Sequence, residues 1–330
     1  MKKFAAFVMV VFAVALALSA CGMDSNAKSS ANKKASVVAT IYPQYDWLKN
    51  ILGEYADKVD LKLLIKNGTD LHSYKPSAQD IAAIANADLV VYVGGESDEW
   101  IEKALEATPK AGRMQVNLMK VLGDRVKEEE VVEGMQAEEH EHEHHEHAEA
   151  PENDEHIWLS LKNAQILVKN LAESVSKIDT ANAPVYRANA IIYASMLHDL
   201  DWAYDSTVSN ASQKTILFGD RFPFRYMVDD YGIKYYAAFV GCSAESEASF
   251  ETVAFLAGMM DSLSLPVIFT IDGSRSNVAL AVRNASKNSK SVPVLQLNSM
   301  QSVTDEQIRS GVDYMSIMKS NLETLKKGLK

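Results

Sequence analysis

Short β-branched segments alternate with amphipathic segments along most of this 330-residue chain, and one long helical segment interrupts the alternation. Apolar residues recur at helical spacing through 180–209, and Pro184 lies near the start, where a helix tolerates proline. At about 1.5 Å per residue such a helix is roughly 40 Å long, enough to connect two lobes. Alternating strands and helices predict a parallel sheet covered by helices. The pattern therefore predicts two α/β lobes joined by a long helix.

The predicted elements follow one another as strand and helix in both halves of the chain. Before the long helix they are strands 36–41, 59–65 and 88–93 and helices 44–52, 78–87, 98–106 and 157–176. After it they are strands 215–218, 235–240, 267–271 and 294–297 and helices near 223–230, 247–262, 275–288 and 304–326. The apolar residues at helical spacing in the long helix include Ile191, Ile192, Met196, Leu197, Leu200 and Trp202.

The N-terminus has the features of a lipoprotein signal. Lys2 and Lys3 precede an apolar run over 4–18, which is short for a membrane span of about 20 residues. The run ends in Leu-Ser-Ala before Cys21, which resembles a bacterial lipobox, and an ordinary secretory signal is the alternative. A polar, Ser/Asn/Lys-rich stretch follows, as in a flexible tether. We therefore expect a signal peptide at 1–20, a tether at 21–35, and an extracytoplasmic protein anchored to the bacterial membrane by lipid on Cys21.

Most of the formal charge of −11 belongs to one segment. The stretch 127–155 holds thirteen acidic residues and one basic residue, and the rest of the mature chain is close to neutral. No basic face is visible, so we do not expect a nucleic-acid partner. With almost no apolar residues, 127–155 is predicted to be a mobile surface loop outside the core.

This acidic segment also contains five of the eight histidines of the protein: His140, His142, His144, His145 and His147. Neutral imidazoles among carboxylates suit zinc, copper or nickel, and the acidic surroundings concentrate cations. A solvated spacer without function is the alternative. Residues 140–144 also match the H-E-x-x-H pattern of zinc proteases, but that motif works on a helix packed against a core, which this segment cannot form. We therefore predict an auxiliary metal-binding loop.

Two other histidines and two aspartates follow predicted strands or begin a helix. His72 lies in a polar loop after a strand, and His156 lies where the chain leaves the acidic segment. Asp220 and Asp272 each follow a strand of the second half. Ligands of open α/β sheets bind beyond the carboxyl ends of strands, so these four side chains could close a four-ligand metal site.

We expect structural roles for the remaining histidine and for the second cysteine. His198 lies within the long helix. Cys242 follows Phe239 and Val240, and these apolar neighbours favour a buried structural thiol over a reactive one. Two cysteines are too few for a disulfide framework.

Five segments of the chain carry the pattern of a known family: Ile41-Tyr42-Pro43 with Tyr45, 68–76 around His72, 87–94, 156–160 and 182–186. In this order, with a lipobox and a His-rich segment, they resemble the solute-binding lipoproteins of zinc and manganese ABC importers over essentially the whole mature chain. The resemblance implies two lobes, each with a parallel four-stranded sheet flanked by helices, joined by one rigid helix. The implied boundaries are 36–178 and 212–330 for the lobes and 179–211 for the helix.

The resemblance also implies one metal ion between the lobes, with two ligands from each. His72 and His156 match the histidines of the first lobe, Asp220 matches the third ligand, and Asp272 matches the fourth. The segment after Asp220 is one residue longer than the family pattern. Glu245 and Glu247 are therefore alternatives to Asp220 as the third ligand. The two arginines beside it are expected to pair with nearby acids: Arg221 and Arg225 with Asp229 or Asp230.

The implied function is capture of a divalent metal ion and its delivery to a membrane permease and its ATPase, by a monomer that catalyses nothing. Two histidines with two carboxylates resemble manganese-type members, whereas the His-rich segment resembles zinc-type members. We favour zinc, because nitrogen and oxygen sites bind it more tightly than manganese. A secreted metallohydrolase and an adhesin are the alternatives of another class. The chain lacks a G-x-S-x-G motif and a phosphate-binding glycine loop, and it shows no repeat that would support adhesion.

Overall fold

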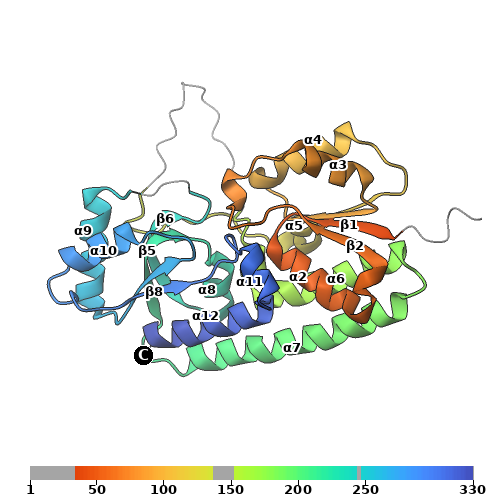
Figure 1. The fold of residues 1–330 in the computed structure, drawn as a ribbon. Helices are drawn as coiled ribbons and strands as arrows, with labels where there is room; N and C mark the ends of the chain where they lie inside the picture. Colours follow the sequence, from red (N-terminus) through yellow and green to blue (C-terminus); the bar gives the residue numbers. More distant parts are fainter. Residues whose placement is uncertain (1–33, 137–151, 244–246, 330) are drawn as a thin grey trace, which may run out of the picture. The chain divides into compact units, whose positions relative to one another are not determined.

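Two parallel four-stranded sheets, one from each half of the chain, organise the computed structural model, which describes residues 34–136, 152–243 and 247–329 (Figure 1). The first sheet has the strand order β2-β1-β3-β4 and the second β6-β5-β7-β8. The predicted α/β fold with a parallel sheet in each half and one long helix is confirmed. Within the described residues, no helix has both the length and the apolar character needed to cross a membrane.

The first half alternates strands with helices in the order that the sequence predicts. Its strands are β1 (Ala35–Ala39), β2 (Val59–Leu63), β3 (Leu89–Tyr92) and β4 (Met114–Asn117). Its helices are α2 (Tyr42–Leu52), α3 (Ala78–Asn86), α4 (Glu99–Ala107), α5 (Leu118–Leu122) and α6 (Leu161–Ile178). Strand β4 was not predicted, since it is short and only Val116 in it is buried.

The second half follows the long helix α7 (Ala183–Ser209). Its strands are β5 (Thr215–Phe222), β6 (Lys234–Val240), β7 (Ile268–Ile271) and β8 (Val294–Leu297). Its helices are α8 (Arg225–Tyr231), α9 (Phe250–Leu263), α10 (Asn277–Ala285), α11 (Asp305–Arg309) and α12 (Tyr314–Gly328). The single helix predicted over 304–326 is wrong, because Gly311 has a φ of 90° and Asp313 caps a new helix.

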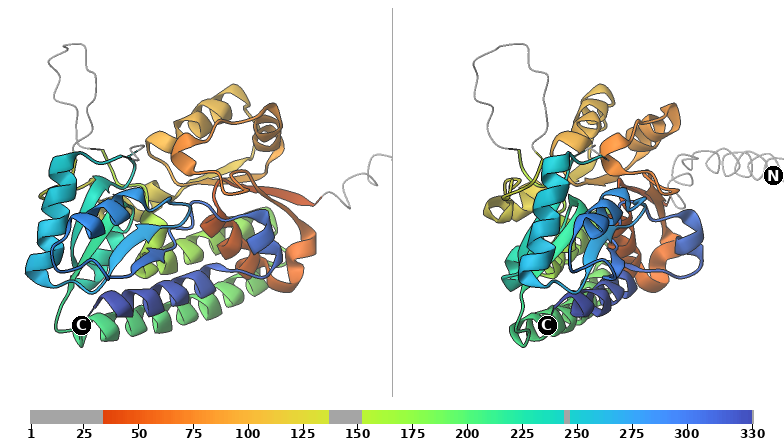
Figure 2. Two further views of the ribbon diagram at one scale, coloured as in Figure 1. Left: turned by 60° about the vertical axis from the view of Figure 1, so that its left-hand side comes forward. Right: turned by 90° about the vertical axis from the view of Figure 1, so that its left-hand side faces the viewer.

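Each sheet is covered on both faces, which explains why its central strands read as continuous apolar runs. In β1, Val37 packs into the cluster that includes α2 and α6, whereas Val38 packs on the opposite face against residues of α3 and α4. Because both faces of this sheet are apolar, its polar side chains gather at the ends of the strands. Figure 2 shows the helices on both sides of the two sheets.

Helix α7 contacts α2 and α6 of the first half and α8 and α12 of the second (Figure 1). Of the six apolar residues at helical spacing, Leu197 and Leu200 are buried. The other four are exposed: Ile191 by 66%, Ile192 by 62%, Met196 by 44% and Trp202 by 68%. A helix that packs on one side buries one stripe, and these residues lie outside it.

The two halves also contact one another directly. The indole Nε1 of Trp158 donates a hydrogen bond to the carbonyl of Ser299 at 2.8 Å, and the hydroxyl of Tyr314 donates to the carbonyl of Trp158 at 2.7 Å. All three residues are buried. The segment after His156 is therefore held against the second half.

The prediction that all of 127–155 lies outside the core is wrong at both ends. The amide of Glu129 donates to the carbonyl of Glu152, and the amide of Asp154 donates to that of Lys127, both at 2.8 Å. Asp154 and Glu155 are each only 2% exposed. Their carboxylates are used in the site described below, which a composition argument cannot detect. The five clustered histidines lie in 137–151, outside the described residues.

Candidate metal centre

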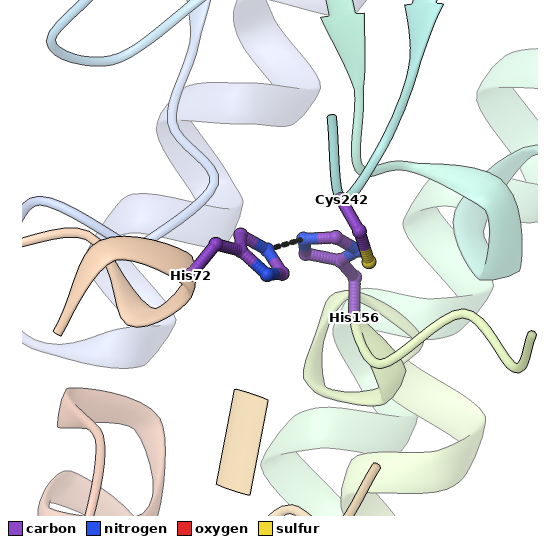
Figure 3. A group of neighbouring side chains, drawn as sticks. All are labelled: His72, His156 and Cys242. Atoms are coloured by element: carbon purple, nitrogen blue, oxygen red, sulfur yellow. Dashed lines mark hydrogen bonds between the residues drawn. The ribbon is translucent and has the colours of Figure 1, made fainter. Parts of the chain in front are cut away.

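Two short turns of the first half bring His72 and His156 together. His72 lies in a turn of 3₁₀ helix at Leu71–Ser73, where its amide donates to Oδ1 of Asp70 at 3.0 Å. His156 precedes the turn Ile157–Leu159, and its amide donates to Oδ1 of Asp154 at 2.8 Å. The Nε2 atoms of the two imidazoles are 3.2 Å apart (Figure 3). The structure therefore brings the two predicted histidines together, and their binding of a metal ion stays a prediction.

The other nitrogen of each imidazole has a partner that fixes its orientation. Nδ1 of His156 lies 3.0 Å from Oδ1 of Asp154, and Nδ1 of His72 lies 2.8 Å from Oγ of Ser97. A carboxylate oxygen accepts a hydrogen bond from the tautomer of His156 that has its proton on Nδ1, and in that tautomer Nε2 presents a lone pair. Histidines that bind metals are held in this way.

The hydrogen-bond chain on the His72 side continues to a second buried carboxylate. The amide of Ser97 donates to Oε1 of Glu155 at 2.9 Å. Burial, and next the proximity of the His156 imidazole, lower the pKa of His72 to about 3. The imidazole of His72 is therefore neutral at physiological pH, which is the form that binds a metal ion.

A third donor lies beside the two imidazoles. One ring nitrogen of His72, one of His156 and the Sγ of Cys242 lie within 4.8 Å of one another (Figure 3). Burial, and next the charge of Glu129, raise the pKa of the Cys242 thiol. The interpretation of Cys242 as a structural thiol missed this position. Cys242 closely follows β6, so the strand-end argument applied to the two aspartates could have found it.

Asp220 and Asp272 line a cavity of about 610 Å³ together with His72, Arg221 and Glu247. They do not belong to the group of donors within 4.8 Å, which among the described residues contains the two histidines and Cys242. Both aspartates therefore share a cavity with His72 and lie outside the three-donor group. Glu245 lies outside the described residues.

Hydrogen bonds occupy both carboxylates. Asp272 accepts from the amide and hydroxyl of Ser299, at 2.5 and 2.6 Å, and from those of Ser302, at 3.3 and 2.5 Å. Asp220 accepts from the amide of Arg221 at 2.9 Å and from that of Ile271 at 3.5 Å. Burial raises the pKa of Asp220. Asp272 thus holds the loop after β8.

The two arginines near Asp220 have different partners. Nη1 of Arg225 lies 3.6 Å from Oδ1 of Asp229, as predicted, and its Nε lies 3.3 Å from Oε2 of Glu130. The expectation that Arg221 pairs with Asp229 or Asp230 is wrong, because its Nη2 donates to Oδ2 of Asp70. Asp70 also caps the turn of His72, so Arg221 ties that turn to the second half of the chain.

Gln301, which the sequence did not indicate, reaches the two imidazoles from the second half. Its Nε2 lies 3.1 Å from Nε2 of His72 and 2.6 Å from Nε2 of His156. Its Oε1 lies 3.3 Å from the Oγ of Ser299, which belongs to the loop held by Asp272. The remaining histidine, His198, is exposed on α7 and takes no part in the site.

Residues 37–328 match the family described as zinc-uptake complex component A, periplasmic (ZnuA). This chain belongs to the ZnuA family. The match covers both sheets and the long helix between them, in agreement with the resemblance that the sequence motifs indicate. The family is that of a solute-binding component of a transport system.

Two characterised relatives align with nearly all of the chain. The high-affinity zinc uptake system protein ZnuA of Bacillus subtilis is 33% identical over 323 residues, which is 97% of this chain and 96% of that protein. The zinc-binding lipoprotein AdcA of Streptococcus pneumoniae is 32% identical over 94% of this chain, which spans 58% of the length of AdcA. The Zn(II)-bound ZnuA-like domain of AdcA superimposes with a TM-score of 0.68 at 29% identity, covering 90% of this chain and 99% of that domain.

Proposed function

We propose that this protein captures zinc outside the cytoplasm and delivers it to the permease and ATPase of an ABC importer. The observation that carries the proposal is the pair of buried imidazoles whose Nε2 atoms are 3.2 Å apart, with each Nδ1 held by a partner of its own. Two nitrogen donors bound to one zinc ion are separated by a similar distance. Family membership supports the same function.

Zinc is favoured over manganese for two reasons. Neutral imidazoles are typical ligands of zinc, whereas manganese sites are richer in oxygen. The B. subtilis and S. pneumoniae relatives are named for zinc uptake and zinc binding. Binding of manganese is the alternative that the titration below distinguishes.

The proposed function gives a role to the other predicted site residues and segments. Asp220 and Asp272, which line the cavity, are the proposed carboxylate ligands from the lobe 212–330. The lobe 36–178 supplies the two histidines, and 179–211 is the helix between the lobes. The proposed auxiliary zinc ligands are His140, His142, His144, His145 and His147. Cys21, after a signal peptide at 1–20 and before a tether at 21–35, is the proposed site of the lipid anchor of a monomeric protein without catalytic activity.

A calorimetric titration tests this function. The chain from residue 22 onward, stripped of metal, is titrated with zinc and separately with manganese, with and without residues 137–150. One tight zinc site should survive the deletion, and weaker additional sites should disappear with it. His72→Ala and His156→Ala should each abolish the tight site.

His198→Ala is the matched control, since it removes an exposed histidine of α7 and should leave the affinity for zinc unchanged. If deletion of 137–150 abolished all tight binding, the histidine pair would not be the principal site. If manganese bound more tightly than zinc, the proposed cargo would be wrong.

A further inference from the structure

We propose that the Cys242 thiolate is a metal ligand from the second half of the chain, so that two imidazole nitrogens and one sulfur lie in the site beside the proposed carboxylates. This inference rests on the proposed function, because it concerns the ion bound by His72 and His156. It assigns a ligand of a different chemical class from the carboxylates that the sequence motifs imply.

The positions of the three donors support a shared ion. Zinc binds imidazole nitrogen at about 2.0–2.1 Å and thiolate sulfur at about 2.3 Å, so neighbouring donors of a tetrahedral site lie roughly 3.3–3.6 Å apart. The two Nε2 atoms, 3.2 Å apart, already meet this spacing. The Sγ of Cys242 is within 4.8 Å of one ring nitrogen of each histidine, so rotation of the Cys242 side chain toward the two Nε2 atoms would complete a three-donor set. The ion would then be held by donors from both halves of the chain.

The competing carboxylates are less available than the thiol. Every oxygen of Asp272 accepts hydrogen bonds from Ser299 or Ser302, and freeing one would release the loop that carries Gln301. Asp220 is engaged by two backbone amides. Cys242, by contrast, uses its thiol in a hydrogen bond to one side chain, that of Glu129. A thiol needs only to lose its proton and turn toward the ion.

Glu129 positions Cys242 and lies next to the proton that must leave. Its Oε1 accepts a hydrogen bond from the Cys242 amide at 3.0 Å, and its carboxylate also accepts one from the thiol. When the metal–sulfur bond forms, the thiol proton is lost, and the Glu129 carboxylate is the acceptor beside it. Glu129 is fixed in turn by the contact between its amide and Glu152. The acidic segment thus supplies a positioning residue for the ligand.

A sulfur ligand changes which ions the site prefers. Thiolates bind zinc and other thiophilic ions well and bind manganese poorly, whereas carboxylates suit manganese. We therefore infer that Cys242 gives this chain a preference for zinc beyond the one that two histidines provide.

Cobalt(II) provides a direct test, because a thiolate bound to cobalt gives a sulfur-to-metal charge-transfer band in the near ultraviolet. The chain from residue 22 onward contains Cys242 as its single cysteine, and Ala35–Lys330 of it forms one compact unit. Wild type with one equivalent of cobalt should show the band, and Cys242→Ser should bind cobalt without it. Both proteins are tested without 137–150, because the proposed auxiliary histidines would otherwise bind cobalt without producing this band.

A second variant measures selectivity. In Cys242→Asp, the ratio of zinc affinity to manganese affinity should fall at least about tenfold, because a carboxylate replaces a thiolate. Gln296→Asp, which places the same carboxylate at an exposed position of β8, is the control and should leave the cobalt band in place.

The outcomes separate the two proposals. Cobalt bound without the band in wild type, with zinc still lost in His72→Ala, would overturn the assignment of Cys242 and leave the proposed function standing. Absence of tight zinc binding in the wild-type chain lacking 137–150 would overturn both. An unchanged zinc-to-manganese ratio in Cys242→Asp would contradict the proposed role of sulfur in selectivity.

Discussion

The side-chain amide nitrogen of Gln301 lies 2.6 Å from Nε2 of His156, on the same lone pair that a metal ion would use. It also lies 3.1 Å from Nε2 of His72. An amide group has two hydrogens and can donate one to each imidazole. A lone pair that accepts a hydrogen bond cannot bind a metal at the same time, so Gln301 and the ion compete for both histidines.

Gln301→Ala is therefore expected to tighten zinc binding. Each neutral hydrogen bond that competes with the ion contributes about 0.5–1.5 kcal/mol, so the loss of one such bond should raise the affinity for zinc about 2- to 12-fold. Competition against a zinc chelator measures the change. Gln296→Ala, which removes an exposed glutamine of β8, serves as control. Weaker binding in Gln301→Ala would instead indicate that this amide supports the site.

Asp154→Asn tests the carboxylate that orients His156. The buried carboxylate accepts from Nδ1 of His156 and makes Nε2 the more basic nitrogen. Loss of such a partner costs about 10- to 100-fold in metal affinity. We expect that loss in a zinc titration of the chain lacking 137–150. Glu152→Gln is the matched control, since it neutralises an exposed acid of the same segment. Equal affinity in Asp154→Asn and wild type would show that this hydrogen bond does not tune the site.

Asp98 should make stability depend on pH. The side chain is 1% exposed, Oδ2 accepts from the amides of Val93 and Gly94, and burial followed by the charge of Glu155 raises its pKa to about 7. The folded state therefore binds the proton more readily than the unfolded chain. The stability that protonation contributes is complete below about pH 4 and is lost as pH rises through about 7.

Urea unfolding of wild type and Asp98→Asn between pH 4 and 8 measures this effect. The unfolding free energy of wild type minus that of the variant should decrease as pH rises, by at most about 1.4 kcal/mol per pH unit. A difference that stays constant, or that increases with pH, would contradict the raised pKa of Asp98.

Met196 and Leu197 are neighbours in α7 with opposite exposure, so they test how this helix packs. Leu197 is fully buried and Met196 is 44% exposed. Leu197→Ala should lower the unfolding free energy by about 2–5 kcal/mol, because it leaves a cavity. Met196→Ala should change it by no more than about 0.5 kcal/mol. Chemical denaturation checks both, and similar losses in the two variants would mean that the Met196 face is covered in solution.

Local patterns in the sequence account for most of the fold. The β-branched runs at β1, β3 and β7 and the helical spacing in α6 and α7 lie within single elements, where burial of one face dictates periodicity. Ser77 illustrates the same point, because its side chain accepts a hydrogen bond from the amide of Asp80 three residues later and caps α3. Where local signals were weak, as in half-polar β4 or at the break before α12, the prediction failed.

The sequence by itself also indicated the two histidines of the proposed site, since each follows or begins an element whose end is recognisable from neighbouring residues. Only the tertiary structure decided which residues from distant parts of the chain lie beside these histidines. Gln301 is 145 residues from His156, and Arg221 is 151 residues from its partner Asp70. The approach of Cys242 depends likewise on how β6 meets the turn at His156. Such contacts depend on the packing of one sheet and its loops against another, and no periodicity within a single element encodes that packing.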